Sequence, residues 1–223
     1  MKLPAKKENI KRSLCATCNR PAKLCICSAF REINNQVAVI LLQHPTEAKK
    51  PFATYRIVES CLQNCLLFEG EDFSQLPALN ELLARPGYKN YLVFPNEKQN
   101  VLTIDIKSGE TTEDVKPTLE EKSEVSSAKI QLIFIDGTWR KAKKIFYENN
   151  FLQSFPSITF KNIPTSEYEI RRSKLKYSLS LVEACYFSLS ALDKPRDYGP
   201  LMEALRLMVS KQKTFSPSPP KAF

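Results

Sequence analysis

Glycine is scarce in this chain of 223 residues, and its scarcity excludes several nucleotide-binding sites. Only five glycines occur, at positions 70, 87, 109, 137 and 199, and no two of them are near each other. A dinucleotide fingerprint or a phosphate loop needs clustered glycines, so that the backbone can approach the phosphates. Ordinary P-loop nucleotide hydrolysis is therefore excluded, and a glycine-rich Rossmann methyltransferase is disfavoured.

Histidine and long apolar runs are also lacking. Any Ser-His-Asp triad would have to use His44, the single histidine, and no GxSxG turn supplies a nucleophile. No uninterrupted apolar run is long enough to cross a bilayer, and no apolar stretch follows the basic N-terminus as it would in a secretory signal. We therefore expect a soluble protein of the cytoplasm.

Positive charge dominates, with a net charge of +9. Residues 105–129 hold seven acids and four bases, a net −3, so the rest of the chain carries +12. This balance favours an anionic partner: nucleic acid, an acidic membrane surface or a phosphorylated substrate. No basic amphipathic helix with exposed apolar residues stands out, which disfavours the membrane. Charge alone does not choose between a nucleic acid and a phosphorylated substrate.

Four of the seven cysteines crowd into thirteen residues, Cys15, Cys18, Cys25 and Cys27. A CxxC pair and a CxC pair, six residues apart, offer four thiolates for one tetrahedral zinc with no open position, as in a structural site. The alternative is four reduced, unliganded thiols. We expect a zinc knuckle within residues 1–30. Cys61 and Cys65, on a predicted helix, and Cys185 are expected to be core residues.

After the knuckle, apolar strand patterns alternate with helical ones. The predicted strands span 36–43, 91–95, 129–135 and 157–160, and the predicted helices span 48–67, 138–149, 180–192 and 200–211. Residues 103–128 are acidic and almost free of aromatics, which predicts a mobile insertion, and the Pro/Ser-rich residues 213–223 predict a disordered tail. The pattern indicates an α/β domain over 31–212, with a mainly parallel sheet covered by helices on both faces.

The turn after the third predicted strand places an acid, a glycine, a hydroxyl and the only tryptophan together: Asp136, Gly137, Thr138 and Trp139. Open α/β sheets bind ligands at the carboxyl ends of their strands. The alternative is local, because Asp136 or Thr138 could cap the following helix while Gly137 relieves strain and Trp139 packs.

Several ordered blocks from Cys15 to about Leu192 carry a family resemblance. They read CATCNRPAKLCIC, LLQHPTEAKK, VFPNE, LIFIDGTWRKAKK, SEYEIRR and LSLVEACYFSL. In these blocks the chain resembles the DTW-domain family. The resemblance implies a SPOUT-like fold with a C-terminal knot, binding of S-adenosylmethionine, and transfer of its 3-amino-3-carboxypropyl group to N3 of a uridine in the tRNA variable loop. The expected by-product is 5′-methylthioadenosine.

The resemblance also implies roles for residues in the matching blocks. Asp136 is the candidate general base, and Thr138 and Trp139 are candidate contacts to the cofactor or to the target base. The implied cofactor contacts are Phe94, Pro95, Ile135, Gly137, Arg171, Leu179, Ser180 and Glu183. The implied substrate contacts are His44, Glu47, Arg140 and Arg172.

Several of these roles have a purely structural alternative. Arg171 and Arg172 could belong to a solvated basic loop, Ser180 and Glu183 fit a capping box, and His44 could be a satisfied turn residue. The chain departs from the family pattern at Ala53, where Asn is frequent, and at Leu181, where Thr is frequent. The competing functions are a SPOUT-type RNA methyltransferase and a non-catalytic zinc-containing RNA-binding protein.

Overall fold

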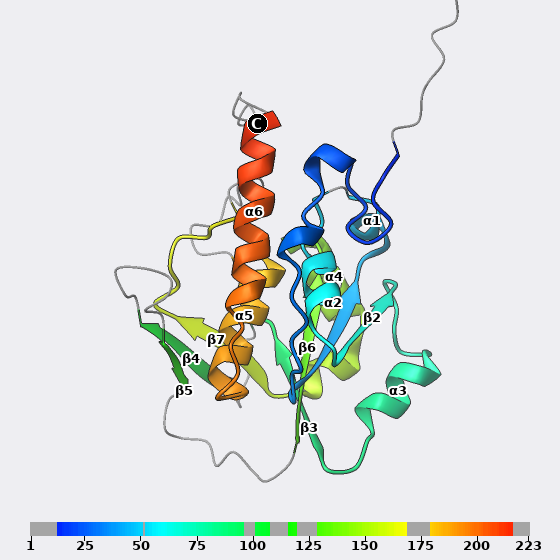
Figure 1. The fold of residues 1–223 in the computed structure, drawn as a ribbon. Helices are drawn as coiled ribbons and strands as arrows, with labels where there is room; N and C mark the ends of the chain where they lie inside the picture. The colour runs from blue at the N-terminus through cyan, green and yellow to red at the C-terminus, as the bar shows by residue number, and fades with distance from the viewer. Residues whose placement is uncertain are drawn as a thin grey trace, which may run out of the picture.

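The computed structural model describes residues 13–50, 52–95, 101–107, 116–119, 129–168 and 179–215. Seven strands form one sheet in the order β2-β1-β6-β3-β7-β4-β5 (Figure 1). The strands are β1 (Ala38–Gln43), β2 (Cys65–Glu69), β3 (Tyr88–Val93), β4 (Val101–Lys107), β5 (Lys116–Leu119), β6 (Lys129–Asp136) and β7 (Ser157–Lys161). All neighbouring pairs are parallel except β4 and β5, which are antiparallel.

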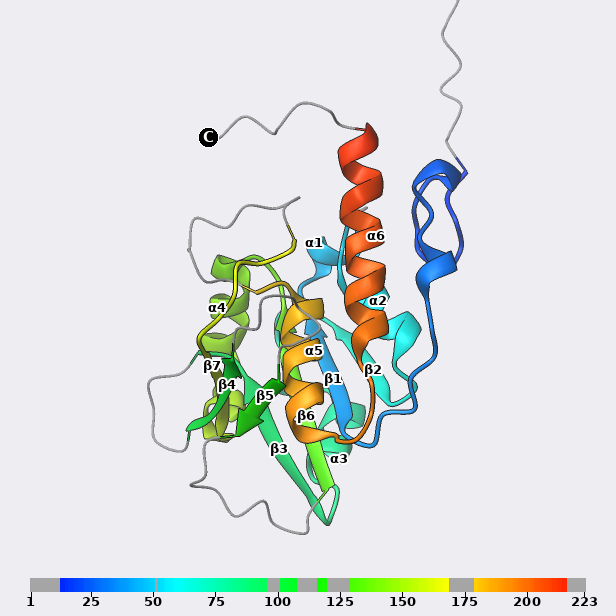
Figure 2. The same ribbon diagram turned by 60° about the vertical axis from the view of Figure 1, so that its left-hand side comes forward.

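The central strands β1 and β6 are apolar on both sides, because helices cover both faces of the sheet. Every residue of β1 is buried. One face carries α2 (Tyr55–Cys61), α5 (Leu181–Leu192) and α6 (Gly199–Phe215), and the opposite face carries α3 (Pro77–Leu83) and α4 (Trp139–Glu148) (Figures 1 and 2). Alternate residues serve the two cores: Val39 and Leu41 face α2 and α5, whereas Ile40 and Leu42 face α3 and α4. The mainly parallel α/β architecture is thus confirmed.

Most predicted elements are found where the sequence placed them. The predicted strands correspond to β1, β3, β6 and β7, and three predicted helices correspond to α4, α5 and α6. The helix predicted over 48–67 is wrong: the chain forms α1 (Pro45–Ala48), then α2, and then strand β2. Cys65 therefore lies on a strand paired with β1 rather than one helical turn after Cys61.

The insertion predicted over 103–128 also needs correction. Strand β4 runs into it, and Ile104 and Ile106 are fully buried in the core beside α5. Strand β5 pairs with β4 at the sheet edge. Residues 108–115 and 120–128 lie outside the described part of the chain.

Two further predictions concern segments near the C-terminus. The tail prediction began at residue 213, but α6 continues to Phe215, and residues 216–223 lie outside the described part. A C-terminal knot would depend on the path of residues 169–178, which also lie outside it. Within the described residues, no helix is long and apolar enough to cross a membrane.

Candidate cofactor pocket and metal centre

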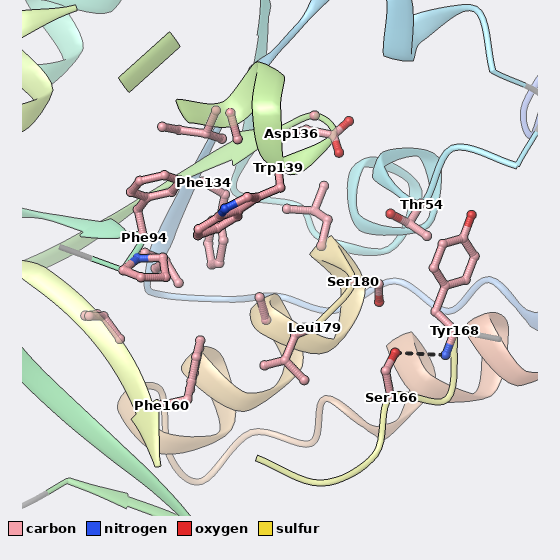
Figure 3. Close-up of a pocket in the computed structure, with 18 of the residues that line it drawn as sticks. Thr54, Phe94, Phe134, Asp136, Trp139, Phe160, Ser166, Tyr168, Leu179 and Ser180 are labelled. Atoms are coloured by element: carbon pink, nitrogen blue, oxygen red, sulfur yellow. Dashed lines mark hydrogen bonds between the residues drawn. The ribbon is translucent and has the colours of Figure 1, made fainter. Parts of the chain in front are cut away.

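A cavity of about 660 Å³ opens at the carboxyl ends of β3, β6 and β7. The first residues of α4 and α5 and the segment from Ile163 to Tyr168 complete its walls (Figure 3). This volume suits a nucleoside-sized ligand, and its position is the usual one for ligands of open α/β sheets. Nine predicted site residues line it: Phe94, Pro95, Ile135, Asp136, Gly137, Thr138, Trp139, Leu179 and Ser180.

One side of the cavity is aromatic. The ring of Phe94 stacks between those of Trp139 and Phe146, with centroids 5.3 and 4.9 Å away. Trp139 begins α4 and is 42% exposed, although the ring is large and apolar. Phe134 and Phe160 extend the apolar surface (Figure 3). Such a surface can bind a planar ring by stacking.

The opposite side is polar. The hydroxyls of Thr54, Ser166, Tyr168 and Ser180 lie there, away from the aromatic rings (Figure 3). Tyr168 Oη donates to the carbonyl of Phe52 at 3.0 Å, which joins the Ile163–Tyr168 segment to the turn before α2. A ligand with one aromatic and one polar end could therefore span the cavity.

Asp136 ends β6 at the rim of this cavity. Its Oδ2 accepts a hydrogen bond from Gln43 Nε2 at 2.7 Å, and its carbonyl accepts from the His44 amide at 3.0 Å. Gln43 is fully buried at the end of β1, so it fixes the carboxylate from the neighbouring strand. Thr138 stands at the N-cap of α4 without a side-chain capping bond. The capping explanation for this threonine is therefore wrong.

Gly137 is needed for the close turn between β6 and α4. A Cβ atom on this residue would lie 3.2 Å from Lys141 Cβ and 3.4 Å from the Ala142 amide nitrogen. The backbone of Asp136 and the helix could not approach each other as closely with a larger residue there. The glycine thus serves close approach rather than an unusual φ angle.

Glu183 supports the polar side but is not among the residues that line the cavity. The carboxylate is 2% exposed and accepts three hydrogen bonds, from Ser180 N at 2.6 Å, Glu167 N at 2.7 Å and Ser166 Oγ at 2.8 Å. The first belongs to the predicted capping box of α5, which is confirmed. The other two fix the segment that carries Ser166 and Tyr168.

Two predicted substrate contacts, His44 and Glu47, are not among the residues that line the cavity. His44 is buried at the N-cap of α1, where Nδ1 accepts from Thr46 N at 3.2 Å and Nε2 lies 2.7 Å from Glu71 Oε1. The buried carboxylate of Glu47 pairs with Lys50 at 2.6 Å and with Lys141 at 3.1 Å. These contacts support the turn-residue interpretation of His44.

Of the three predicted arginine contacts, only Arg140 lies in the described part of the chain. Arg140 is exposed on α4, next to Trp139. Arg171 and Arg172 lie outside the described residues, so their predicted contacts stay predictions.

The four clustered cysteines lie together at one end of the molecule, and their ligand atoms are all within 4.8 Å of one another. The sulfur atoms of Cys15 and Cys27 are 3.5 Å apart, and those of Cys18 and Cys25 are 3.7 Å apart. A tetrahedral zinc with Zn–S bonds of about 2.3 Å needs sulfur atoms about 3.8 Å apart. The cluster therefore fits such an ion, and its four donors leave no position for a substrate.

The environment of the cluster also fits a cation. Backbone N–H groups of Cys18 and Thr17 lower the pKa of Cys15 to about 6, whereas burial and the neighbouring thiols raise that of Cys27 to about 12. Four adjacent thiolates repel one another, so a central cation would be needed to hold all of them ionised.

Sequence reasoning found Ser180 on the polar side of the cavity but missed its other three hydroxyl residues. Thr54, Ser166 and Tyr168 reach the cavity from segments more than 100 residues apart. Tyr168 had one available signal, since it stands in the block SEYEIRR that carries the family resemblance. The chain departs from the family pattern at Leu181 and Ala53. Leu181 lines the cavity, and the backbone carbonyl of Ala53 accepts a hydrogen bond from Arg20.

Comparisons with known proteins agree with this arrangement of motifs. The family model described as the DTW domain matches residues 12–213. Three relatives bear the name tRNA-uridine aminocarboxypropyltransferase 2. They come from Macaca fascicularis (28% identical over 86% of this chain and 59% of the relative), Mus musculus (26% over 82% and 58%) and Drosophila melanogaster (24% over 82% and 68%). The chain thus spans less than two thirds of the length of the first two. No solved structure matches significantly.

Proposed function

The chain belongs to the DTW domain family, and from this premise we propose that it is a tRNA-uridine aminocarboxypropyltransferase. The observation that carries the proposal is the cavity of about 660 Å³ beside the Asp136–Trp139 turn, with one aromatic and one polar side. S-adenosylmethionine has a matching division, because it joins a planar adenine to a charged amino-acid chain. The names of the three relatives support the same activity.

The proposed reaction forms one bond and breaks one. When bound, S-adenosylmethionine supplies its Cγ carbon to uridine N3, the Cγ–S bond breaks with its electron pair on sulfur, and 5′-methylthioadenosine leaves. The N3 proton must go to a base. Among the described pocket residues, Asp136 is the carboxylate placed to accept it, since Gln43 holds its Oδ2 at the rim.

Positioning supplies the other part of the proposed catalysis. We assign the adenine to the aromatic side formed by Phe94 and Trp139, and the amino-acid chain to the polar side near Ser180 and Tyr168. Pro95, Ile135, Gly137, Thr138 and Leu179 would complete the contacts, and Arg171 keeps its proposed pairing with the cofactor carboxylate. This arrangement would direct Cγ rather than the methyl group toward the incoming base.

The exposed side of α4 is the proposed entry surface for tRNA. Arg140 and Lys143 are exposed beside the cavity, and Tyr147, 63% exposed, follows Lys143 by one helical turn. Basic side chains suit phosphates, and exposed aromatic rings suit unstacked bases. Within the described part of the chain, neither Arg140 nor Lys143 makes an ion pair, so both charges are available to a nucleic acid.

We also propose a SPOUT-like fold with a C-terminal knot, and a structural zinc held by the four clustered cysteines. The proposed partner is tRNA, which would pass near His44, Glu47 and Arg172. A cytoplasmic location fits a chain in which no described cysteine forms a disulfide.

One experiment tests the activity directly. The purified full chain is incubated with S-adenosylmethionine and unmodified tRNA, and the nucleosides and the small product are identified by mass spectrometry. We expect 3-(3-amino-3-carboxypropyl)uridine and 5′-methylthioadenosine in equal amounts. Methylated nucleoside with S-adenosylhomocysteine would replace the proposal by a methyltransferase, and tRNA binding with neither product would replace it by a binding protein.

A further inference from the structure

Arg20 is a buried cation inside the metal-binding knuckle. Its side chain is 1% exposed. Nη1 donates to the carbonyl of Cys18 at 3.1 Å, and Nη2 lies 3.4 Å from the carbonyl of Ala53 and 2.8 Å from the sulfur of Met208. Nε is buried without a partner. A buried charge is strongly unfavourable unless an opposite charge compensates it.

Two more cations approach the same knuckle. Arg56 of α2 reaches the carbonyl of Thr17 at 3.5 Å, and Lys211 of α6 donates to the carbonyl of Cys25. Figures 1 and 2 both show the knuckle beside α6. Three cations thus bind carbonyls of the metal-binding segment, each within one residue of a cysteine or on the cysteine itself.

No side-chain carboxylate balances these charges. Residues 13–30 contain no Asp or Glu. Within the described residues, none of the three cations forms an ion pair with a carboxylate. Without ionised sulfurs, the knuckle carries only the positive charges of Arg20 and Lys23, and it would repel the surface on which it docks.

We propose that the metal–thiolate centre is the counter-ion of Arg20, and that Arg20 transmits metal binding to the wall of the cavity. Four thiolates around one divalent ion carry a net charge of about −2, which attracts Arg20, Arg56 and Lys211 together. The inference does not depend on the proposed enzymatic activity.

The path to the cavity is short. Arg20 holds the carbonyl of Ala53. The next residue, Thr54, lines the cavity, and the preceding carbonyl, that of Phe52, accepts the hydroxyl of Tyr168. Arg20 is therefore a positioning residue, because it acts on the cavity through residues 52–54. Its two Nη groups serve the knuckle and the wall at once, which a lysine ammonium at this distance could not reproduce.

Hydrogen exchange at residues 52–54 tests the proposal without any substrate. The full chain is compared with and without zinc, removed by a chelator and quantified by mass spectrometry, as wild type, Arg20→Met and Arg20→Lys. Lys23→Met is the matched control, since Lys23 is an exposed cation of the same knuckle.

Zinc removal should make exchange of the Ala53 amide, which donates to the Lys50 carbonyl at 3.2 Å, about tenfold faster or more in the wild type, because residues 52–54 lose the contact to Arg20 that fixes them and open more often. Zinc-loaded Arg20→Met should already exchange fast there, with little further change when zinc is removed. Arg20→Lys should bind zinc more tightly than Arg20→Met but leave 52–54 equally unprotected. Lys23→Met should resemble the wild type.

Two outcomes would overturn the inference. If exchange at 52–54 in the wild type does not respond to zinc removal, metal binding has no effect on the cavity wall, regardless of the results for the variants. Equal acceleration by zinc removal in wild type and Arg20→Met would show that the metal acts on the wall by a route other than Arg20. Because neither measurement uses S-adenosylmethionine or tRNA, failure here is distinguishable from failure of the proposed reaction.

Discussion

The knuckle and the cavity are built in opposite ways. The knuckle takes its four sulfur ligands from thirteen consecutive residues and brings them together with tight local turns. The cavity takes its walls from residues between 54 and 184, and needs three strands and both helical layers to assemble them. Both parts rest on the same apolar core, which includes Cys18 and Ile26 of the knuckle, but the knuckle also offers four sulfur atoms to a metal ion.

Because of this difference, changes in the knuckle should affect mainly the stability of the fold, and changes in the cavity mainly turnover. A metal site in a small module supplies folding free energy directly, so damage there should appear first as lost structure. The cavity residues stand at strand ends and helix starts whose positions the core already fixes. Changes to them should reduce activity while the fold persists. Each variant below tests one side of this division, beginning with the largest expected effect.

Cys18→Ser should have the largest effect on stability. Cys18 is fully buried and its sulfur lies 3.7 Å from that of Cys25, so serine removes one metal ligand from the centre of the knuckle. We expect less bound zinc and a loss in the free energy of unfolding on the order of several kcal/mol. Metal analysis and denaturant unfolding measure the two quantities.

Cys65→Ser is the matched control for thiol removal. Cys65 lies on β2, far from the knuckle in sequence, and burial raises the pKa of its thiol to about 12. This variant should keep its zinc. If Cys18→Ser also kept full zinc and normal stability, the four cysteines would not be the metal site.

Asp136→Asn should have the largest effect on turnover. The change keeps the shape and an oxygen that can accept from Gln43, but it removes the negative charge. We expect turnover to fall about a hundredfold or more, as for a lost general base, while stability stays nearly unchanged. Single-turnover kinetics and thermal unfolding report the two effects separately.

Asp136→Ala distinguishes chemistry from lost structure. Alanine leaves the buried Gln43 amide without this acceptor, so it should add a stability deficit of about 1–3 kcal/mol to the loss of turnover. Normal turnover in a folded Asp136→Asn protein would leave this carboxylate with a structural role alone.

Sequence reasoning succeeded where the signal was local. The cysteine cluster, the α4 turn and the Ser180–Glu183 capping box each lie within a short stretch of the chain: the four cysteines lie together, and the turn and the capping box are found at the predicted residues. The sheet was predictable in outline because β1 and β6 each carry a nearly continuous apolar run, as strands covered on both faces do.

The failures have physical reasons. Leu62, Cys65 and Leu66 fit helical spacing, but pairing with β1 makes residues 65–69 an edge strand. In β4, Leu102, Ile104 and Ile106 are buried at alternate positions. That period of two was visible in the sequence, yet the acidic composition that follows outweighed it. On the polar side of the cavity only Ser180 was predicted, because tertiary structure alone brings Thr54 to Tyr168.

Glu183→Gln should have an intermediate effect, and it should reduce both stability and binding of S-adenosylmethionine. Glutamine offers one oxygen and an NH₂ group to three donors, so at least one of Ser166 Oγ, Glu167 N and Ser180 N loses its acceptor. We expect a loss of about 1–3 kcal/mol in unfolding free energy, together with a raised KM for S-adenosylmethionine as Ser166 and Tyr168 shift. Ser180→Ala removes the side-chain cap of α5 together with a hydroxyl of the cavity, and should cost about 1 kcal/mol in unfolding free energy. An unchanged KM in a folded Glu183→Gln protein would leave Glu183 with the cap alone.

Lys143→Gln should have the smallest effect, confined to tRNA binding. Lys143 is exposed one helical turn after Trp139, and its Nζ lies 5.3 Å from the centre of the indole ring. If it contacts a phosphate, its loss should weaken binding a few-fold and reduce the slope of log affinity against log salt by about one. Lys144→Gln is the control, because this neighbouring lysine already pairs with Glu71 and Glu148 and has less charge to offer an RNA. Titrations at several salt concentrations compare the two variants on one helix. An unchanged slope in Lys143→Gln, or the same reduction in both variants, would exclude this side of α4 from the proposed tRNA surface. Lys143 would then have only its cation–π contact with Trp139.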